Sequence, residues 1–367
     1  MIPFRAGVAL VASALALGLV AAATPTASAS LPSIADPAQS PRQVTAAKAD
    51  TRGLFGATDP TYDGVYRQSA AILGLAAVGA QVPPSAVAWL LRQQCSDGSF
   101  AAYRADTAGP CPPSDATTFT GPDSNSTAIA AMALLRAGDD VPRRADRLRA
   151  GAAALRWLKN QQGTGGGWVW IRGLAADSVS TAMAAAAVAK TSRASHDRAM
   201  QWLRRHMNAA QQCALRFQGG TLADPLSTAW AFISTQGPLP YQPLTGERKG
   251  VRRCTGSAPV TASATWLADQ LISGGGQIPS TFDPDATDWN STALATLGMT
   301  QKRGSGPAMR AGLRALQRNV DAYVDTPAGD SAAALGTLLM VAHAGRIAPR
   351  DFGGHDLVAR LLVTMRR

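Results

Sequence analysis

Runs of β-branched residues are scarce in this sequence, and Ala and Leu dominate its apolar positions. Strands favour β-branched and aromatic side chains, whereas Ala and Leu are strong helix formers. The 35 glycines and 23 prolines gather between the apolar stretches, where turns are expected. Because 46% of the 367 residues are hydrophobic, the chain can bury a large core. The composition therefore predicts an all-α folded protein.

Histidine and cysteine are also scarce, with four of each, and the motifs that would make them catalytic are missing. The sequence contains no Gly-x-Ser-x-Gly, His-Glu-x-x-His or Gly-x-x-x-x-Gly-Lys pattern. Without a Cys-x-x-Cys spacing, a zinc site is the weaker interpretation of the cysteines. The cluster Asp283, Asp285 and Asp288 could bind calcium outside the cell, but a polar loop ending in a helix cap explains it better. We therefore expect no metal site.

Positive charge is in excess, with a net charge of +11. Its Arg and Lys residues are scattered along amphipathic stretches and are not interleaved with aromatic residues, a pattern that argues against nucleic-acid binding. An exported basic protein would instead meet anionic cell-wall polymers or lipid headgroups. A solvated positive surface is the simpler explanation.

The N-terminus is typical of an export signal. Arg5 precedes an uncharged apolar stretch at residues 7–23, and Ala27-Ser28-Ala29 offers a cleavage site. An uncleaved anchor is the alternative, since the apolar stretch barely reaches spanning length. We expect cleavage, a secreted, extracytoplasmic protein and no stable membrane anchor afterwards. The predicted boundaries are 1–29 for the signal peptide, 30–55 for an Ala/Pro/Ser-rich linker and 56–367 for the folded domain.

The cysteines fit the same export route. Cys95, Cys111, Cys213 and Cys254 are even in number and lie in loop-like surroundings, so disulfides are expected outside the cytoplasm. Four cysteines allow three connectivities. We favour Cys95–Cys111 and Cys213–Cys254 because each pair brackets a long insertion.

Two kinds of segment alternate along the chain. The first is an amphipathic helix containing Trp-Leu, with a Gln one helical turn after the Trp on the same face, as at Trp89, Trp157 and Trp266. The second begins with Asp, a strong helix N-cap, and continues into small apolar residues. Its copies are Asp123–Ala128, Asp177–Ala182, Asp224–Ala229 and Asp288–Ala293, with weaker ones at Asp330 and Asp63.

The second kind of segment has no polar face, so its helices must be buried. The first kind has a charged side that can face solvent, which predicts an inner and an outer ring of helices. Inner helices are expected to begin near residues 64, 124, 178, 225, 289 and 330, each followed by an outer helix. Six pairs predict an (α/α)6 toroid, with an open helical solenoid as the alternative.

The repeat resembles a known family. Trp157-Leu158, Gln162 and Gly167-Trp168 resemble the QW repeat of squalene and oxidosqualene cyclases, and a second copy lies at Trp89-Leu90, Gln94 and Gly98-Ser99-Phe100. The resemblance implies the terpenoid cyclase and prenyltransferase toroid. In that family the Gln and aromatic residues tie the end of an outer helix to the adjoining inner helix. The same fold carries several unrelated activities.

The chemistry of that family is not conserved in the motif. Its class II cyclases protonate their substrate from a DxDD motif, and Asp288 matches the first position. Asn290 and Ser291 occupy the positions of the acid and its neighbour, and neither is a strong proton donor. The Asp, Cys and His that hold zinc in protein prenyltransferases are missing as well. We therefore expect no cyclase acid and no catalytic residue, and lean away from an enzyme.

A cavity encircled by helix N-termini remains, and such termini suit polar or anionic groups. The sequence thus predicts a secreted protein that holds a small molecule in the toroid cavity. Tryptophans near the openings could contact it, although plain packing accounts for each of them. The expected rim residues are Asp123, Asn125, Trp168, Trp170, Asp177, Asp224, Trp230, Asp288, Trp289, Asn290 and Asp330.

The ligand and two rival functions stay open. Residues 177–183 are similar to repeats of the intrinsic-factor and transcobalamin toroid, which makes a corrinoid one candidate ligand and an isoprenoid another, with no cofactor certain. One rival is a terpenoid cyclase-like, prenyltransferase-like or lyase-like enzyme with a divergent acid, for which Asp285, Asp288 and Asp330 are the first residues to suspect. The other is a structural module that docks to a cell-surface or transporter partner.

Overall fold

Each Asp-initiated segment forms a buried helix. The computed structural model describes residues 50–139, 141, 143–216, 220, 222–243, 254, 258–301 and 306–367. The predicted signal peptide and the linker up to residue 49 lie outside the described residues. The inner helices are α2 (Gly64–Ala77), α4 (Ser124–Arg136), α6 (Ser178–Val188), α8 (Pro225–Ser234), α10 (Trp289–Thr300) and α13 (Ala332–Gly345).

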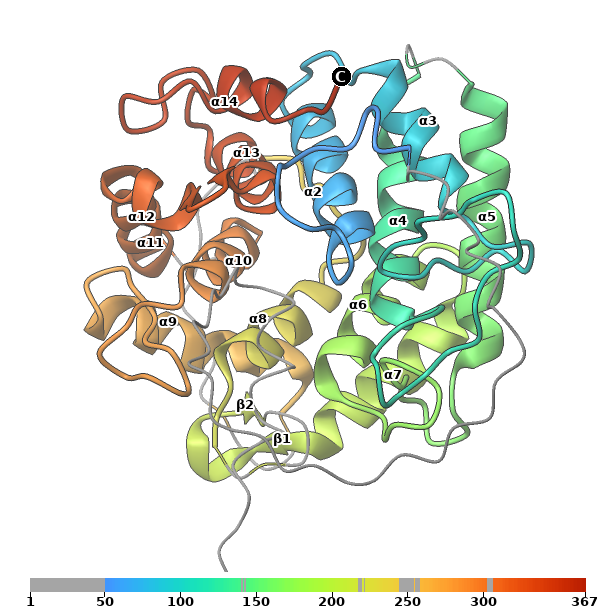
Figure 1. Ribbon diagram of the computed structural model, residues 1–367. Coiled ribbons are helices and arrows are strands. Elements are labelled where there is room, and N and C mark those ends of the chain that lie inside the picture. Colours follow the sequence, from blue (N-terminus) through green and yellow to red (C-terminus); the bar gives the residue numbers. More distant parts are fainter. Residues whose placement is uncertain are drawn as a thin grey trace, which may run out of the picture. The chain divides into compact units, whose positions relative to one another are not determined.

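These six helices form a closed ring within the unit Thr51–Arg367 (Figure 1). Each packs against the next, and α13 returns to pack against α2. The closure confirms the all-α toroid and rules out the open solenoid. The starting residues also agree with those expected from the repeat to within two positions.

An outer helix follows each inner one and packs against it. The outer helices are α3 (Pro84–Arg92), α5 (Arg144–Gln161), α7 (Arg193–His206), α9 (Ser263–Ser273), α11 (Gly306–Arg318) and α14 (Leu357–Val363). Most of their Trp-Leu residues are packed inside: Trp89, Leu90, Leu158 and Leu267 are fully buried, whereas Trp157 and Trp266 are partly exposed. Figure 1 shows them surrounding the inner ring.

The sequence pattern missed several short elements. These are η1 (Ala209–Gln211), η2 (Val260–Ala262), α12 (Val320–Val324), and the strands β1 (Met207–Asn208), β2 (Ala214–Leu215), β3 (Asp325–Thr326) and β4 (Gly329–Asp330). β1 pairs antiparallel with β2, and β3 with β4. Two-residue strands have no periodicity that a pattern search could detect.

A side chain one turn inside five of the six inner helices connects the helix to the chain that leads into it, and in four of these helices it is the threonine of the Asp-initiated segment. The amide of Trp168 donates to Thr181 Oγ1 at 2.9 Å, and Ile278 donates to Thr292 Oγ1 at 3.0 Å. The same bond joins Phe100 to Thr127 and Leu215 to Thr228, and in α2 the amide of Phe55 donates to Gln68 Oε1 at 2.8 Å. All five acceptors are fully buried.

The Gln residues of the QW-like repeat connect outer helices to one another. Gln94 Nε2 donates to the carbonyl of Gly98 and, at 2.8 Å, to that of Ala150 in α5. Gln162 Nε2 does the same with Gly166 and with Ser195 in α7. The family resemblance implied a tie to the adjoining inner helix. Here the Gln instead fixes the spacing of successive outer helices.

The first and last described segments meet. Arg366 donates its amide to the carbonyl of Leu54 at 2.8 Å, and its guanidinium binds the carbonyls of residues 56–58. Leu54 and Phe55 are fully buried, so the packed unit begins at Thr51, ahead of the expected start at residue 56. No helix in the described part of the chain is long and apolar enough to cross a membrane.

The turn after α9 provides a matched test of the packing between outer helices. Gly275 and Gly276 both have positive φ, of 63° and 101°, but a Cβ on Gly276 would collide with the Ala311 carbonyl of α11, whereas one on Gly275 meets nothing. We expect Gly276→Ala to lower the free energy of unfolding by about 1–3 kcal/mol more than Gly275→Ala. Urea unfolding of both variants measures the difference. Equal losses would mean that the close approach to α11 does not limit packing.

Candidate functional site

The aspartates that begin the inner helices act as buried N-caps. Asp123 accepts the amide of Ser126 at 2.7 Å, and Asp177 accepts that of Ser180 at 2.8 Å. Asp224 and Asp288 cap α8 and α10 in the same way. Asp123, Asp177 and Asp224 are at most 7% exposed, so these carboxyls stabilise helix ends and offer little surface to a ligand.

Burial changes the acidity of these caps. It raises the pKa of Asp123 to about 7, against the opposing effect of the Ser126 amide bond. Burial also raises the pKa of Asp177, Asp224 and Asp288 above the ordinary range. A buried carboxyl prefers its neutral form because low-polarity surroundings disfavour the charge.

Two of the expected rim tryptophans lie in the core. Trp168 is fully buried and donates Nε1 to the carbonyl of Leu158 at 2.8 Å, and Trp230 is 1% exposed. Neither indole is exposed to an opening, and the bond to Leu158 places Trp168 against α5. Their position in sequence, close to helix starts, does not reveal the side on which the indole packs.

The centre of the ring is filled. Every residue of α6 from Ser180 to Val188 is at most 4% exposed, and α8 is equally buried from Ser227 to Ser234. A helix buried around its whole circumference has no side facing open space, whichever side faces the axis. Along these helices, the expected ligand cavity is replaced by packed side chains.

Partial exposure returns in the first turn of the inner helices. Tyr66, Asn125, Val179, Leu226 and Trp289 are each partly exposed there. Asn125 Oδ1 is buried and has no hydrogen-bond partner among the described residues. The mouth of the ring is therefore a shallow, mixed surface.

The acids suspected of catalysis are held apart in separate interactions. Asp330 receives two bonds from Arg360, both at 2.8 Å, and the same guanidinium binds Asp321 and Asp325. Asp285 lies in an exposed turn, and Asp288 is occupied as a cap. Asn290, in the acid position of the cyclase motif, accepts the Tyr323 hydroxyl at 3.2 Å.

A groove of about 650 Å³ opens beside this mouth, on loops that precede α4 and α6. One wall carries the disulfide and the prolines of residues 110–113. Trp157 and Gln161, from the end of α5, form a second wall, and Trp170 and Arg172 a third. Gln161 and Arg172 are exposed. Of the expected rim residues, Trp170 lines this groove, and Asp123 lies beneath it next to Ser124, which also lines it.

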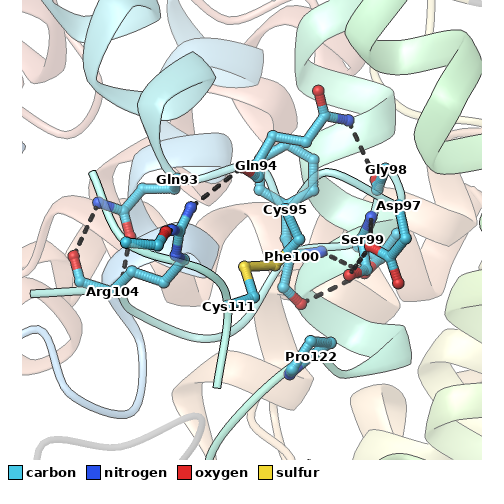
Figure 2. Close-up of a disulfide and its surroundings, with 12 residues drawn as sticks. Gln93, Gln94, Cys95, Asp97, Gly98, Ser99, Phe100, Arg104, Cys111 and Pro122 are labelled. Atoms are coloured by element: carbon cyan, nitrogen blue, oxygen red, sulfur yellow. Dashed lines mark hydrogen bonds between the residues drawn. A yellow bond between two sulfur atoms is a disulfide. The ribbon is translucent and has the colours of Figure 1, made fainter. Parts of the chain in front are cut away.

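The disulfide wall is braced from both sides (Figure 2). Cys95 and Cys111 form a disulfide with their Cα atoms 5.6 Å apart, and Cys213 and Cys254 form the second disulfide. Both pairings are the expected ones. Gln93 accepts the amide of Arg104 at 2.7 Å, and Arg104 Nη2 donates to Gly109 at 2.6 Å. The insertion therefore has a fixed shape despite its lack of regular structure.

The two groove tryptophans are oriented by polar and aromatic partners. Trp157 Nε1 donates to Asp97 Oδ2 at 3.0 Å. Trp170 stacks on Phe119, with ring centroids 5.4 Å apart. Gln161 belongs to the Trp-Leu repeat, but the repeat does not indicate that its side chain lines a groove, and Arg172 lies outside the repeat; the long disulfide-bracketed insertion was the one signal that marked this region.

Comparison with known proteins supports the fold alone. No protein-family model and no curated protein sequence matches the chain. A cellobiose 2-epimerase from Spirochaeta thermophila is similar in structure, with a TM-score of 0.51 and 13% identity over 83% of this chain and 93% of that one. A type II terpene cyclase from Scytonema (14% identity, 76% and 98% covered) and a protein from Actinoplanes (17%, 76% and 99%) reach TM-scores of 0.33 and 0.35. The chain has an α/α toroid fold.

Asp123→Asn tests the buried cap. Asn keeps an oxygen for the Ser126 amide but cannot ionise. Because the folded-state pKa of Asp123 is raised to about 7, this carboxyl makes the wild type lose stability as pH rises from 4 to 7, and the variant lacks that contribution. Relative to wild type, the variant should gain up to about 1.4 kcal/mol per pH unit across that window. Thermal unfolding at several pH values measures the gain.

The control is Asp115→Asn. Asp115 is partly exposed, and the Thr117 amide lowers its pKa, so this variant should lose stability relative to wild type as pH rises. If both variants show the same change in stability with pH, burial does not set the pKa of Asp123.

Proposed function

We propose that the chain is an exported carbohydrate-binding protein that holds its ligand in the groove beside the helix starts. The observation that carries this proposal is the combination of the partly exposed indole of Trp157 with two exposed hydrogen-bonding side chains, Gln161 and Arg172, in one disulfide-braced groove. Trp170 also lines the groove but is 6% exposed, so it supports the wall rather than offering a free face. The proposed ligand site lies on the loops, whereas the sequence predicted a site on the toroid axis.

The chemistry of the groove suits a sugar. A pyranose ring presents C–H groups that pack on aromatic faces, and hydroxyls that exchange hydrogen bonds with amide, carboxylate and guanidinium groups. A volume of about 650 Å³ lies within the range of small-ligand sites. Asp97, Gln161 and Arg172 supply the polar partners.

The corrinoid and isoprenoid ligands are less well supported. Both were expected within the ring of inner helices, and the described residues there are packed together.

Export fits this proposal. The two disulfides are consistent with an oxidising environment outside the cell, and the net charge of +11 suits contact with anionic surface polymers. A docking partner at the cell surface would then be a polysaccharide.

Catalysis on the bound sugar is the second candidate. It is favoured by the raised pKa of Asp123, a carboxyl beneath the groove, and by a toroid neighbour that is an enzyme. Asp123 is 2% exposed and occupied as a cap, so a bound sugar would not reach it. We therefore expect binding without turnover.

Titration with cellotetraose tests the groove; the probe is chosen because the toroid neighbour is named for its action on cellobiose. Gln161→Ala and Arg172→Ala should each weaken binding about threefold to tenfold, since each removes a hydrogen-bonding group from the groove. Isothermal calorimetry on the purified mature protein measures the affinity, and mass spectrometry of the same samples detects any product.

The matched control is Arg310→Ala, which removes an exposed arginine from α11. It should leave cellotetraose binding unchanged. The proposal fails if the wild type does not bind cellotetraose, or if Arg310→Ala weakens binding as much as Arg172→Ala. Product formation that stops in Asp123→Asn would favour the enzyme instead.

A further inference from the structure

A second pocket lies across the loop that forms one wall of the groove. Its volume is about 460 Å³. Residues 169–173 contribute to the groove, and residues 174–178 line this pocket. Trp202, Arg205 and His206, at the end of α7, form the opposite wall with Arg216, which follows β2. We call it the basic pocket.

The charge balance of the basic pocket is positive. Arg205, His206 and Arg216 are all exposed. Asp177, the one acidic side chain among its described lining residues, is occupied by the Ser180 amide, and burial raises its pKa. The described residues therefore provide no free carboxylate to neutralise the two guanidinium groups.

The donors of the pocket are held in place. Arg205 Nη2 donates to the carbonyl of Gly165 at 2.8 Å, which orients the guanidinium. The other N–H groups of this guanidinium take no part in that bond. His206 stacks on Trp202 with ring centroids 3.6 Å apart, and its Nδ1 lies 2.7 Å from the Trp202 carbonyl. A carbonyl only accepts, so Nδ1 carries the hydrogen. No hydrogen bond or ion pair from a described residue is seen at the Arg216 guanidinium.

We propose that the basic pocket binds an oxyanion, a phosphate or a carboxylate, carried by the sugar chain that lies in the groove. Arginine forks match the geometry of both anions and bind them by charge-assisted hydrogen bonds. The inference rests on the proposed function in one respect: a ligand crossing residues 169–178 would place neutral rings in the groove and an acidic substituent in the pocket. The ligand class is then an anionic polysaccharide.

Three probes separate the sources of charge: cellotetraose is neutral, tetragalacturonate carries carboxylates and poly(glycerol phosphate) carries phosphodiesters. At least one charged probe should bind the wild type more tightly than cellotetraose, and less tightly as salt is added. Arg216→Gln should weaken that binding at least about fivefold and leave cellotetraose binding unchanged. Whichever charged probe responds identifies the anion.

Arg204→Gln is the matched control, because Arg204 precedes Arg205 on α7, is equally exposed and lines a different pocket. It should leave all three affinities unchanged. Equal weakening by Arg204→Gln and Arg216→Gln, or no preference for either charged probe, would overturn the oxyanion site while leaving the groove intact. Failure of the groove gives a different result: cellotetraose does not bind, and Arg172→Ala changes nothing.

Discussion

One hydrogen bond supports most of this structure: in five of the six inner helices, the chain before the helix donates a backbone amide to a side chain one turn inside that helix. In four repeats the acceptor is a threonine, as between Trp168 and Thr181, and in α2 it is Gln68. A buried amide without a partner is costly, so each bond fixes where its loop joins its helix. The Asp cap and the buried first turn of each of these helices depend on this junction between loop and helix.

Because of this constraint, the residues that stabilise the fold and the residues proposed to bind a ligand lie in different parts of the structure. Inner helices anchored at close spacing bury nearly every side chain, which leaves no room along α6 or α8 for a ligand. The loops that precede α4, α6 and α8 carry the groove and the basic pocket. Disulfide Cys95–Cys111 and the Gln93–Arg104 pair then give the longest of these loops a fixed shape. Function thus lies on a rigid scaffold but outside its repeats.

The division also explains which features the sequence could predict. Asp caps and small-residue helices repeat, so the six inner helices and their starts could be identified from the pattern. Closure followed from the count, and both disulfides from the insertions that they bracket. The groove itself does not repeat: Trp157 and Gln161 belong to the repeat and Arg172 does not, and none of them marks a site until the disulfide-braced loop is placed beside them. Trp168 and Trp230 were misplaced for the same reason, because helix proximity does not fix the direction of an indole.

Hydrogen exchange with and without saturating cellotetraose most directly tests whether the ligand binds the loops rather than the axis. Slower exchange is expected in residues 95–122 and 157–173, which form the groove. Residues 180–188 of α6 and 227–234 of α8 should exchange alike in both states, since they are already buried. Protection confined to the first turns of the six inner helices, with residues 95–122 unchanged, would contradict the groove and place the ligand on the axis of the ring.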